Sequence, residues 1–304
     1  MTGPYLGFPP RRHYLTLPAG NRQIALQGLG LYDATFLHQR FALASGRLLL
    51  GLGLEFPFRL RYDPPVPKWW DRWLTEVAEP LLGPVAHTAF RLPGQPGFAQ
   101  RVTVLLFGAD ARPLAFGKLL ARDEPSALSV AAQEELTANP PASFHIPHLL
   151  AHGRFDNMAY QLHEILPAGP HRQPDFDPAM VHRVIDELQD RLGSLPRTPE
   201  TPESHVPAHT DFLSINLRRA ADGNLWLIDW DNVDWAPPLT DELAYWMGGV
   251  ARRFGPTGRR RIEQVRELLR SRGTDEQIAT AIAWRKVRRP VEAIKGEQII
   301  RDGL

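Results

Sequence analysis

The sequence predicts an α+β fold with two lobes, an N-terminal antiparallel sheet followed by a mostly helical part. Three strand-like runs, VAHTAFRL, QRVTVLLFG and LAFGKLLAR, follow one another between residues 85 and 122 and are separated by turn-rich segments. Such short connections favour an antiparallel meander. After residue 169, most apolar residues recur at helical spacing instead.

Composition narrows the functional class. The chain has 304 residues, 43% of them hydrophobic, and a formal net charge of +1. This size allows one large domain or two smaller ones, and the charge offers no general attraction to nucleic acid or to anionic membranes. There is no cysteine, which excludes disulfides, thiolate metal sites and cysteine nucleophiles.

Neither a signal peptide nor a membrane-spanning helix is predicted. The N-terminal residues lack an apolar core, and the most apolar run, LASGRLLLGLGLEF, is interrupted by Arg47. That run is shorter than the roughly 18 to 20 residues that a membrane helix needs. We therefore expect a cytoplasmic protein.

Residues 1–63 are rich in proline and glycine, and we expect an extension of strands and loops whose role the sequence does not reveal. A helix follows, because five apolar residues keep helical spacing before Gly83-Pro84 ends it. These residues are Trp70, Trp73, Leu74, Val77 and Leu81.

After the three strands, Ser126 is a suitable N-cap for a helix that Asn139-Pro140 stops, and MAYQLHEIL predicts one further strand. Residues 64–168 are thus expected to form the first lobe. Residues 169–304 form the second, in which Asp177 caps a helix with Pro178 at its first position. Thr274 and Gln277 form a capping box for a later helix.

Carboxylates gather at one place in the second lobe, in the segment AHTDFLSINLRRAADGNLWLIDWDNVDW. We expect NLWLIDWD to be a strand that pairs with FLSINLRR across the turn at Asp222-Gly223. Such a hairpin would bring Asp211 and Asn216 close to Asp229. An oxygen-rich site of this kind suits Mg²⁺, which shares its coordination with water and substrate phosphates.

His209, Asp211 and Asn216 stand in the order H-x-D-x-x-x-x-N and are followed by Ile-Asp-Trp-Asp. This pair of motifs resembles the catalytic loop and metal-binding strand of the protein-kinase-like superfamily. It is most similar to the aminoglycoside phosphotransferase and choline kinase branch. The segment WAPPLTDELAYW, which contains Asp241, is also similar to that family, and the resemblance spans roughly residues 66–246.

The resemblance implies a two-lobed protein-kinase-like fold with ATP and Mg²⁺ as cofactors. It implies transfer of the γ-phosphoryl group to a hydroxyl of a small molecule such as an aminoglycoside, a choline-like alcohol or a sugar. By the same resemblance, Asp211 is the catalytic base, Asn216 and Asp229 hold the metal, and His209 and Asp241 support the loop. Asp231 is either a second support or a turn former.

In the first lobe, the resemblance assigns Lys118 to the nucleotide phosphates, with Glu134 or Glu135 as its helix partner. Glu164 to Leu166 would offer backbone groups to the adenine. The sequence does not separate the two glutamates, and it leaves open the acceptor, the choice between ATP and GTP, and the oligomeric state.

Three features depart from the family. Prolines interrupt the loop PGQPGFAQ, which carries Gly94 and Gly97 where a phosphate-covering glycine loop would lie. Residues 1–63 have no counterpart, and the interval between hinge and catalytic loop is short. Two alternatives therefore stay open: a nucleotide-binding pseudokinase with a regulatory role, and a magnesium-dependent phosphohydrolase that makes no use of Lys118.

Overall fold

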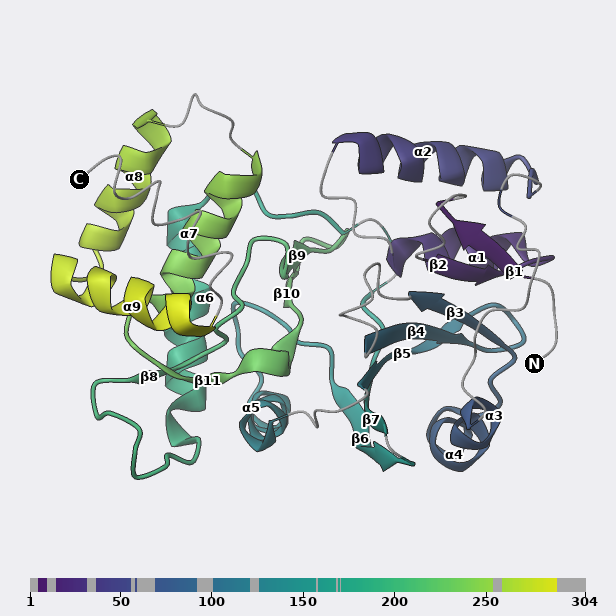
Figure 1. Cartoon of the computed structure of the whole chain (residues 1–304), viewed down its shortest axis with the longest axis horizontal. Helices are drawn as coiled ribbons and strands as arrows, with labels where there is room; N and C mark the ends of the chain where they lie inside the picture. Colours follow the sequence, from purple (N-terminus) through teal and green to yellow (C-terminus); the bar gives the residue numbers. More distant parts are fainter. Residues whose placement is uncertain are drawn as a thin grey trace. The chain divides into compact units, whose positions relative to one another are not determined.

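The computed structural model describes residues 5–9, 15–31, 37–55, 58, 69–91, 101–120, 126–156, 158–167, 169, 171–253 and 259–288. The chain divides into two compact units (Figure 1). The sheet unit comprises Met1–Pro125 and Leu149–Ile165, and the helical unit comprises Ser126–His148 and Leu166–Leu304. The helix after Ser126, which the sequence analysis grouped with the first lobe, thus belongs to the helical unit.

The sheet unit contains a seven-stranded sheet of order β1-β2-β3-β4-β5-β7-β6, in which all neighbours are antiparallel. Its strands are β1 (Tyr5–Phe8), β2 (Leu15–Pro18), β3 (His87–Arg91), β4 (Arg101–Phe107), β5 (Pro113–Leu120), β6 (Leu149–Phe155) and β7 (Met158–His163). The predicted meander β3–β4–β5 is confirmed. Strand β6 was missed, and β1 and β2 extend the sheet into the N-terminal segment.

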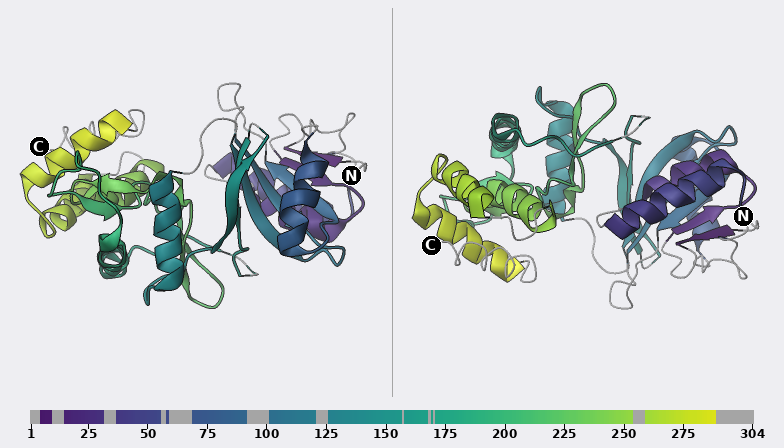
Figure 2. Two further views of the ribbon diagram at one scale, coloured as in Figure 1. Left: turned by 90° about the horizontal axis from the view of Figure 1, so that it is seen from below. Right: turned by 90° about the horizontal axis from the view of Figure 1, so that it is seen from above.

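Each face of the sheet carries its own apolar cluster. Helices α1 (Arg22–Gly28) and α2 (Leu37–Gly51) contribute to one cluster, together with η1 (Leu29–Leu31) and the side chains of Ala89 and Phe107. The predicted helix before Gly83 forms α3 (Trp70–Trp73), the π-helical η3 (Leu74–Ala78) and α4 (Glu79–Leu82), which pack on the other face with Val104 and Leu106. Figure 2 shows α2 and α3–α4 crossing opposite faces of the sheet.

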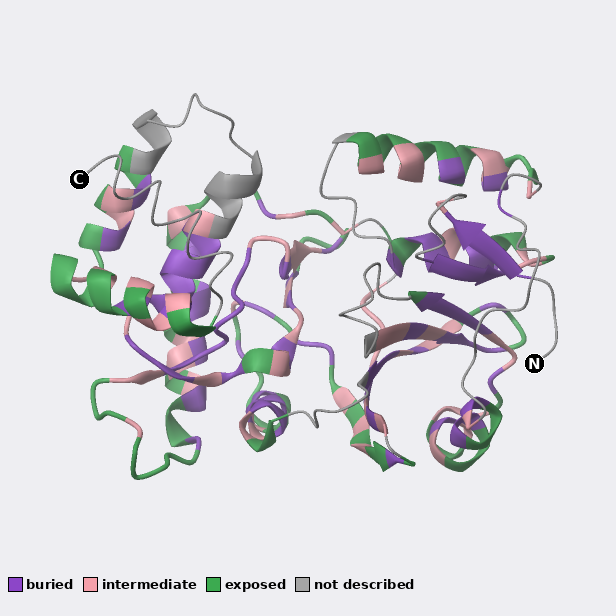
Figure 3. Cartoon of the chain, in the orientation of Figure 1, coloured by how far each residue is buried: buried purple, intermediate pink, exposed green. Residues whose placement is uncertain are grey.

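The prediction of strands and loops for residues 1–63 is wrong where α2 lies. The segment is apolar on more than one side, so its helical period is hidden in the sequence. Leu50 is buried and Gly46 lies against the Phe8 ring, whereas Phe41 and Leu48 are 66% and 64% exposed. Figure 3 shows this exposed side of α2.

The helical unit is built on α6 (Pro178–Arg191), α7 (Thr240–Arg253), α8 (Arg259–Arg270) and α9 (Asp275–Arg288). The predicted N-cap of α6 is present, since Asp177 accepts the N–H of Met180 at 3.1 Å. The predicted capping box of α9 is also present, with Thr274 and Gln277 bonded reciprocally. Residues 240–246 of α7 are buried, and Figure 3 shows this part of the helix in purple.

Two short ladders complete the helical unit. Strand β9 (Leu217–Arg219) pairs with β10 (Leu225–Leu227), which confirms the predicted hairpin, and β8 (Val206–Ala208) pairs with β11 (Asp234–Ala236). Helix α5 (Ala127–Ala138) is capped by Ser126 as predicted. The predicted strand NLWLIDWD ends earlier than expected, at Leu227, because Asp229 takes a left-handed backbone conformation before the turn η6 (Trp230–Asn232). No helix in the described ranges is long and apolar enough to cross a bilayer.

Candidate functional site

The loop that follows β8 carries Asp211 and is held from three sides. The carboxylate of Asp241, at the start of α7, accepts the backbone N–H groups of His209 and Thr210 at 2.8 Å each. The Thr210 hydroxyl donates to the carbonyl of Asn232 at 2.5 Å, and Arg285 Nη1 of α9 donates to the Thr210 carbonyl at 2.8 Å. These contacts hold Thr210 at a φ of 58°, a conformation that costs a non-glycine residue free energy.

His209 is fully buried and contributes packing to this loop. Its ring lies edge-on to Trp230 at 4.8 Å and near Phe212 at 6.3 Å, and Nε2 lies 3.1 Å from the carbonyl of Ile228. Thus the ring joins the loop to the segment just before Asp229, in line with the supporting role that the resemblance implies.

Asp211, Asn216 and Asp229 are joined through the backbone. Asn216 Nδ2 donates to the Asp211 carbonyl at 2.8 Å, and the N–H of Ile228 donates to the Asn216 carbonyl at 2.9 Å. Asp211 and Asn216 are each 6% exposed, while Asp229 is half-buried. Asp231 is also half-buried, in η6, two residues further along.

Burial raises the pKa of the Asp241 carboxyl to about 7, and the neighbouring Glu242 carboxylate adds to the rise. The two N–H donors and Arg285 act in the opposite direction. Burial also raises the pKa of Glu242, which lies 3.5 Å from Arg272. Two adjacent buried carboxylates disfavour each other's ionisation.

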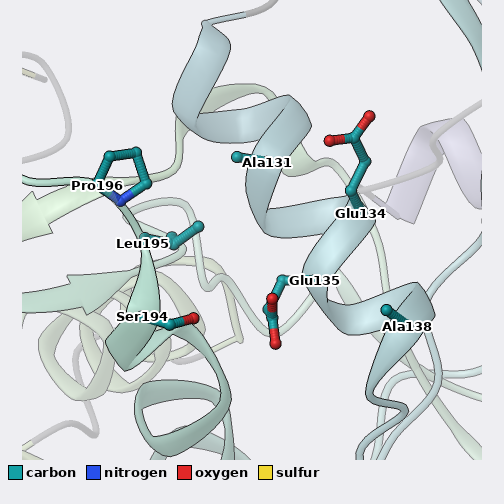
Figure 4. A pocket seen from close by; sticks show the side chains of 7 residues that line it. All are labelled: Ala131, Glu134, Glu135, Ala138, Ser194, Leu195 and Pro196. Atoms are coloured by element: carbon teal, nitrogen blue, oxygen red, sulfur yellow. The ribbon is translucent and has the colours of Figure 1, made fainter.

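Helix α5 contacts the turn after Asp229 through Ser129, whose Oγ accepts the N–H of Val233 at 3.2 Å. The glutamates of α5 lie elsewhere: Glu134 is exposed, and Glu135 accepts a hydrogen bond from Asn139 Nδ2 at 2.7 Å. Both line a pocket of about 350 Å³ beside Ser194 and Leu195. In Figure 4, Glu135 lies between α5 and Ser194, whereas the Glu134 carboxylate points away from Ser194.

The other predicted nucleotide-binding residues are Lys118, Glu164 and Leu166. Lys118 is in β5 of the sheet unit and is 5% exposed. Glu164 follows β7 directly and is half-buried, as is Leu166, the first residue after the boundary between the units. The loop PGQPGFAQ, with Gly94 and Gly97, lies outside the described residues.

The predicted site residues did not include Arg285, Ser129 and Thr210. Arg285 lies four residues after the buried Ala281, so helical periodicity alone places both on the same side of α9. For Thr210 and Ser129 the sequence carries no signal, since their contacts join segments far apart in the chain.

No family model and no curated protein sequence matches the chain. Among solved structures, an aminoglycoside phosphotransferase, APH(4)-Ia, in a ternary complex with AMP-PNP and hygromycin B, is similar at 13% identity with a TM-score of 0.50. That match covers 78% of this chain and 99% of the other.

Two further solved structures were also found. Spectinomycin phosphotransferase APH(9)-Ia, in complex with ADP and spectinomycin, has 12% identity and a TM-score of 0.49, covering 78% of this chain and 90% of that one. Choline kinase LicA from Streptococcus pneumoniae has 13% identity and a TM-score of 0.39, covering 76% and 90%. The fold assignment rests on the APH(4)-Ia structure: the chain has the two-lobed, protein-kinase-like fold of an aminoglycoside phosphotransferase.

Proposed function

We propose that the protein is a magnesium-dependent phosphotransferase that moves the γ-phosphoryl group of ATP to a hydroxyl of a small molecule. The observation that supports this most is the hydrogen-bonded path from Asp211 through Asn216 to the residue before Asp229. A carboxylate for the acceptor hydroxyl and two oxygen ligands for a metal are the parts that such a transfer needs.

The chemistry of the donor set fits magnesium. Asn216 Nδ2 is engaged by the Asp211 carbonyl, so the carboxamide oxygen is the atom that would coordinate a cation, beside the Asp229 carboxylate. Both are hard oxygen donors. The described residues contain no group of three or more His, Cys, Asp or Glu side chains suited to a metal. A cation here would therefore take its other ligands from water and phosphate oxygens.

In this proposal Asp211 accepts the hydrogen bond of the acceptor hydroxyl and receives its proton as the phosphoryl group transfers. Lys118 holds the phosphates, and the backbone from Glu164 to Leu166 binds the adenine. Magnesium at Asn216 and Asp229 would offset the negative charge on the phosphates. Of the two glutamates, Glu134 is the one whose carboxylate is not bonded to Asn139, so we favour it over Glu135 as the helix partner of Lys118.

The comparison supports the proposed class of acceptor. The APH(4)-Ia structure contains AMP-PNP and hygromycin B, which supports a hydroxyl-bearing small molecule as acceptor here, together with ATP as donor. The predictions of a cytoplasmic location and of no nucleic-acid or membrane partner stay predictions.

The test is a thermal melt with ATP, with and without magnesium, for wild type and Asp229→Asn. A ligand at about 100 times its dissociation constant adds roughly 2.7 kcal/mol to the free energy of unfolding, which raises the Tm by several degrees. We expect a magnesium-dependent rise that Asp229→Asn loses. Asp222→Asn, at the exposed turn of the same hairpin, should keep it. No rise in wild type with any nucleotide would refute the proposal.

A further inference from the structure

Exposed apolar side chains gather on α2 and on the turn that follows it. Of the eight large apolar side chains that are exposed in the described part of the chain, four lie in this short segment and are each at least 50% exposed. They are Phe41, Leu48, Leu52 and Leu54, and we call them the α2 apolar face. Monomeric soluble proteins rarely collect such side chains at one place unless the patch binds something.

Helical geometry places this face opposite the side of α2 that packs on the sheet. Phe41, Leu48 and Leu52 follow one another at intervals of seven and four residues, which is one side of an α-helix. Leu52 belongs to this side because its N–H still donates to the Leu48 carbonyl at 2.9 Å. The opposite side carries the buried Leu50. The view from above in Figure 2 shows no other described element of the sheet unit over α2, so the face is a convex ridge and not a groove.

Positive charge surrounds this ridge. Within residues 1–54, the described part contains three exposed arginines, Arg22, Arg40 and Arg47, and no aspartate or glutamate. A Cβ at Gly51 of α2 would lie 4.0 Å from Arg22 Nη2. The formal net charge of +1 conceals this, because residues 1–54 hold 5 of the 35 basic but only 1 of the 34 acidic residues. They carry a net charge of +4, and the rest of the chain carries −3.

Charge and size decide what fits this ridge. A second copy would bring the arginines of two α2 helices together. The ten exposed residues between positions 38 and 54 are also fewer than the roughly 20 to 30 residues per partner of a standard interface. A flat anionic lipid surface requires no groove and no matching shape. Leucine and phenylalanine enter the boundary between headgroups and acyl chains, while arginines meet the lipid phosphates.

We propose that α2 docks the protein on an anionic lipid bilayer, lying in the plane of the surface with the α2 apolar face in the headgroup boundary and Arg40 and Arg47 on lipid phosphates. Attachment is reversible, since its strength scales with the apolar area of one helix and a few cations. The expectation of no membrane partner rested on the net charge of the whole chain, which the basic N-terminal segment does not share. The inference is independent of the proposed function, because no residue of α2 belongs to the candidate site.

The experiment is sedimentation of the full chain with vesicles of phosphatidylglycerol and phosphatidylcholine in equal parts, and with vesicles of phosphatidylcholine alone. We expect sedimentation with the anionic vesicles only, weakening as salt rises. Leu48→Gln should lower the partition coefficient about tenfold, because less apolar surface is buried. Arg47→Gln should lower it about fivefold. Leu81→Gln is the matched control, since Leu81 is similarly exposed but lies in α4 on the opposite face of the sheet, and it should bind like wild type.

A second measurement follows the α2 apolar face directly. The chain has no cysteine, so Leu48→Cys and Leu81→Cys each provide a single attachment site for a polarity-sensitive fluorophore. On anionic vesicles its emission should shift to the blue at position 48 and stay unchanged at position 81. Equal shifts at both positions would overturn the inference, and so would equal sedimentation with both kinds of vesicle or none with either.

Two further outcomes would overturn the inference by assigning the α2 apolar face to a protein. A wild-type dimer that does not sediment with vesicles, and that Leu48→Gln converts to a monomer, would assign the face to a second copy of the chain. Retention of wild type on immobilised polyglutamate, without sedimentation on vesicles, would assign it to an acidic protein.

Discussion

The Asp241 carboxylate and the backbone of Thr210 are joined by a 2.8 Å hydrogen bond, one residue before Asp211. Asp241 also accepts the N–H of His209 at the same distance, so one carboxylate satisfies two consecutive buried N–H groups. Since Thr210 lies in the left-handed region, the loop would not keep this conformation without its partners. The position of Asp211 therefore depends on α7.

Asp241→Ala should lower the free energy of unfolding by about 2 to 4 kcal/mol, because it leaves two buried N–H groups without an acceptor. Urea unfolding at constant pH measures this loss. Glu242→Ala is the matched control: Glu242 is equally buried, but its charged neighbour is Arg272 rather than the loop. If the two variants lose the same free energy of unfolding, the hydrogen bonds from Asp241 to the loop do not contribute the expected stability.

The stability of the protein should depend on the ionisation of Asp241. Its pKa rises from 3.8 to about 7 on folding, so the native state binds the proton more tightly than the unfolded chain does. The resulting stabilisation is fully present below about pH 4 and is lost as the pH rises through 7. Glu242, whose pKa is also raised, acts in the same direction.

Between pH 5 and pH 8, wild type should therefore lose about 2 to 3 kcal/mol more of its free energy of unfolding than Asp241→Asn, which cannot titrate at this position. Urea unfolding at both pH values gives the difference. Parallel pH profiles for the two proteins would show that the Asp241 carboxyl is ionised throughout this range, held so by its N–H donors and Arg285.

Arg285→Met should destabilise the protein by about 2 to 3 kcal/mol and slow phosphoryl transfer, because it removes a charged donor from the buried Thr210 carbonyl. Methionine keeps most of the apolar stem, so the change isolates the guanidinium. Arg288→Met, in the same helix, removes the surface ion pair with Asp234 and should have little effect. Equal effects of the two variants would argue against a special role for Arg285.

The parts of the fold that the sequence predicted are those with local causes. Ser126 and Asp177 cap helices through their own side chains, and Gly83 ends α4 with a φ of 79°. The hairpin β9–β10 was also predicted, since a short turn joins its strands. Capping, periodicity and turn chemistry act within a few residues and need no knowledge of the tertiary structure.

What the sequence could not predict depends on distant partners. The ladder β8–β11 has three residues on each side and joins segments almost thirty positions apart. The left-handed conformation at Asp229 ends a strand that periodicity alone would continue. In the site, H-x-D-x-x-x-x-N identified Asp211 and Asn216, but the contacts of Ser129 and Arg285 with this region arise only on folding.

Ser129→Ala should cost about 1 to 2 kcal/mol, because the N–H of Val233 is buried and loses its acceptor. The turn after Asp229 should loosen as well, so the magnesium-dependent part of ATP binding should weaken more than the part seen without metal. Thermal melts with ATP, with and without magnesium, test both effects. Thr137→Ala removes a hydroxyl that bonds to Gln133 of its own helix, and serves as the control.

Asp211→Asn separates a phosphotransferase from a pseudokinase that only binds nucleotide. Asparagine keeps the shape of the side chain but cannot take a proton, so phosphoryl transfer should fall by about 10² to 10⁴, while Mg-ATP affinity stays within about twofold. The assay follows ATP consumption with aminoglycosides, choline and sugars as candidate acceptors. Asp231→Asn, in the adjacent turn η6, should remain active.

If wild type binds Mg-ATP but transfers phosphate to none of these acceptors, and Asp211→Asn behaves identically, the regulatory alternative gains support. Should Asp211→Asn abolish hydrolysis that Lys118→Ala leaves intact, the chain is a phosphohydrolase instead, since only the kinase mechanism needs the lysine.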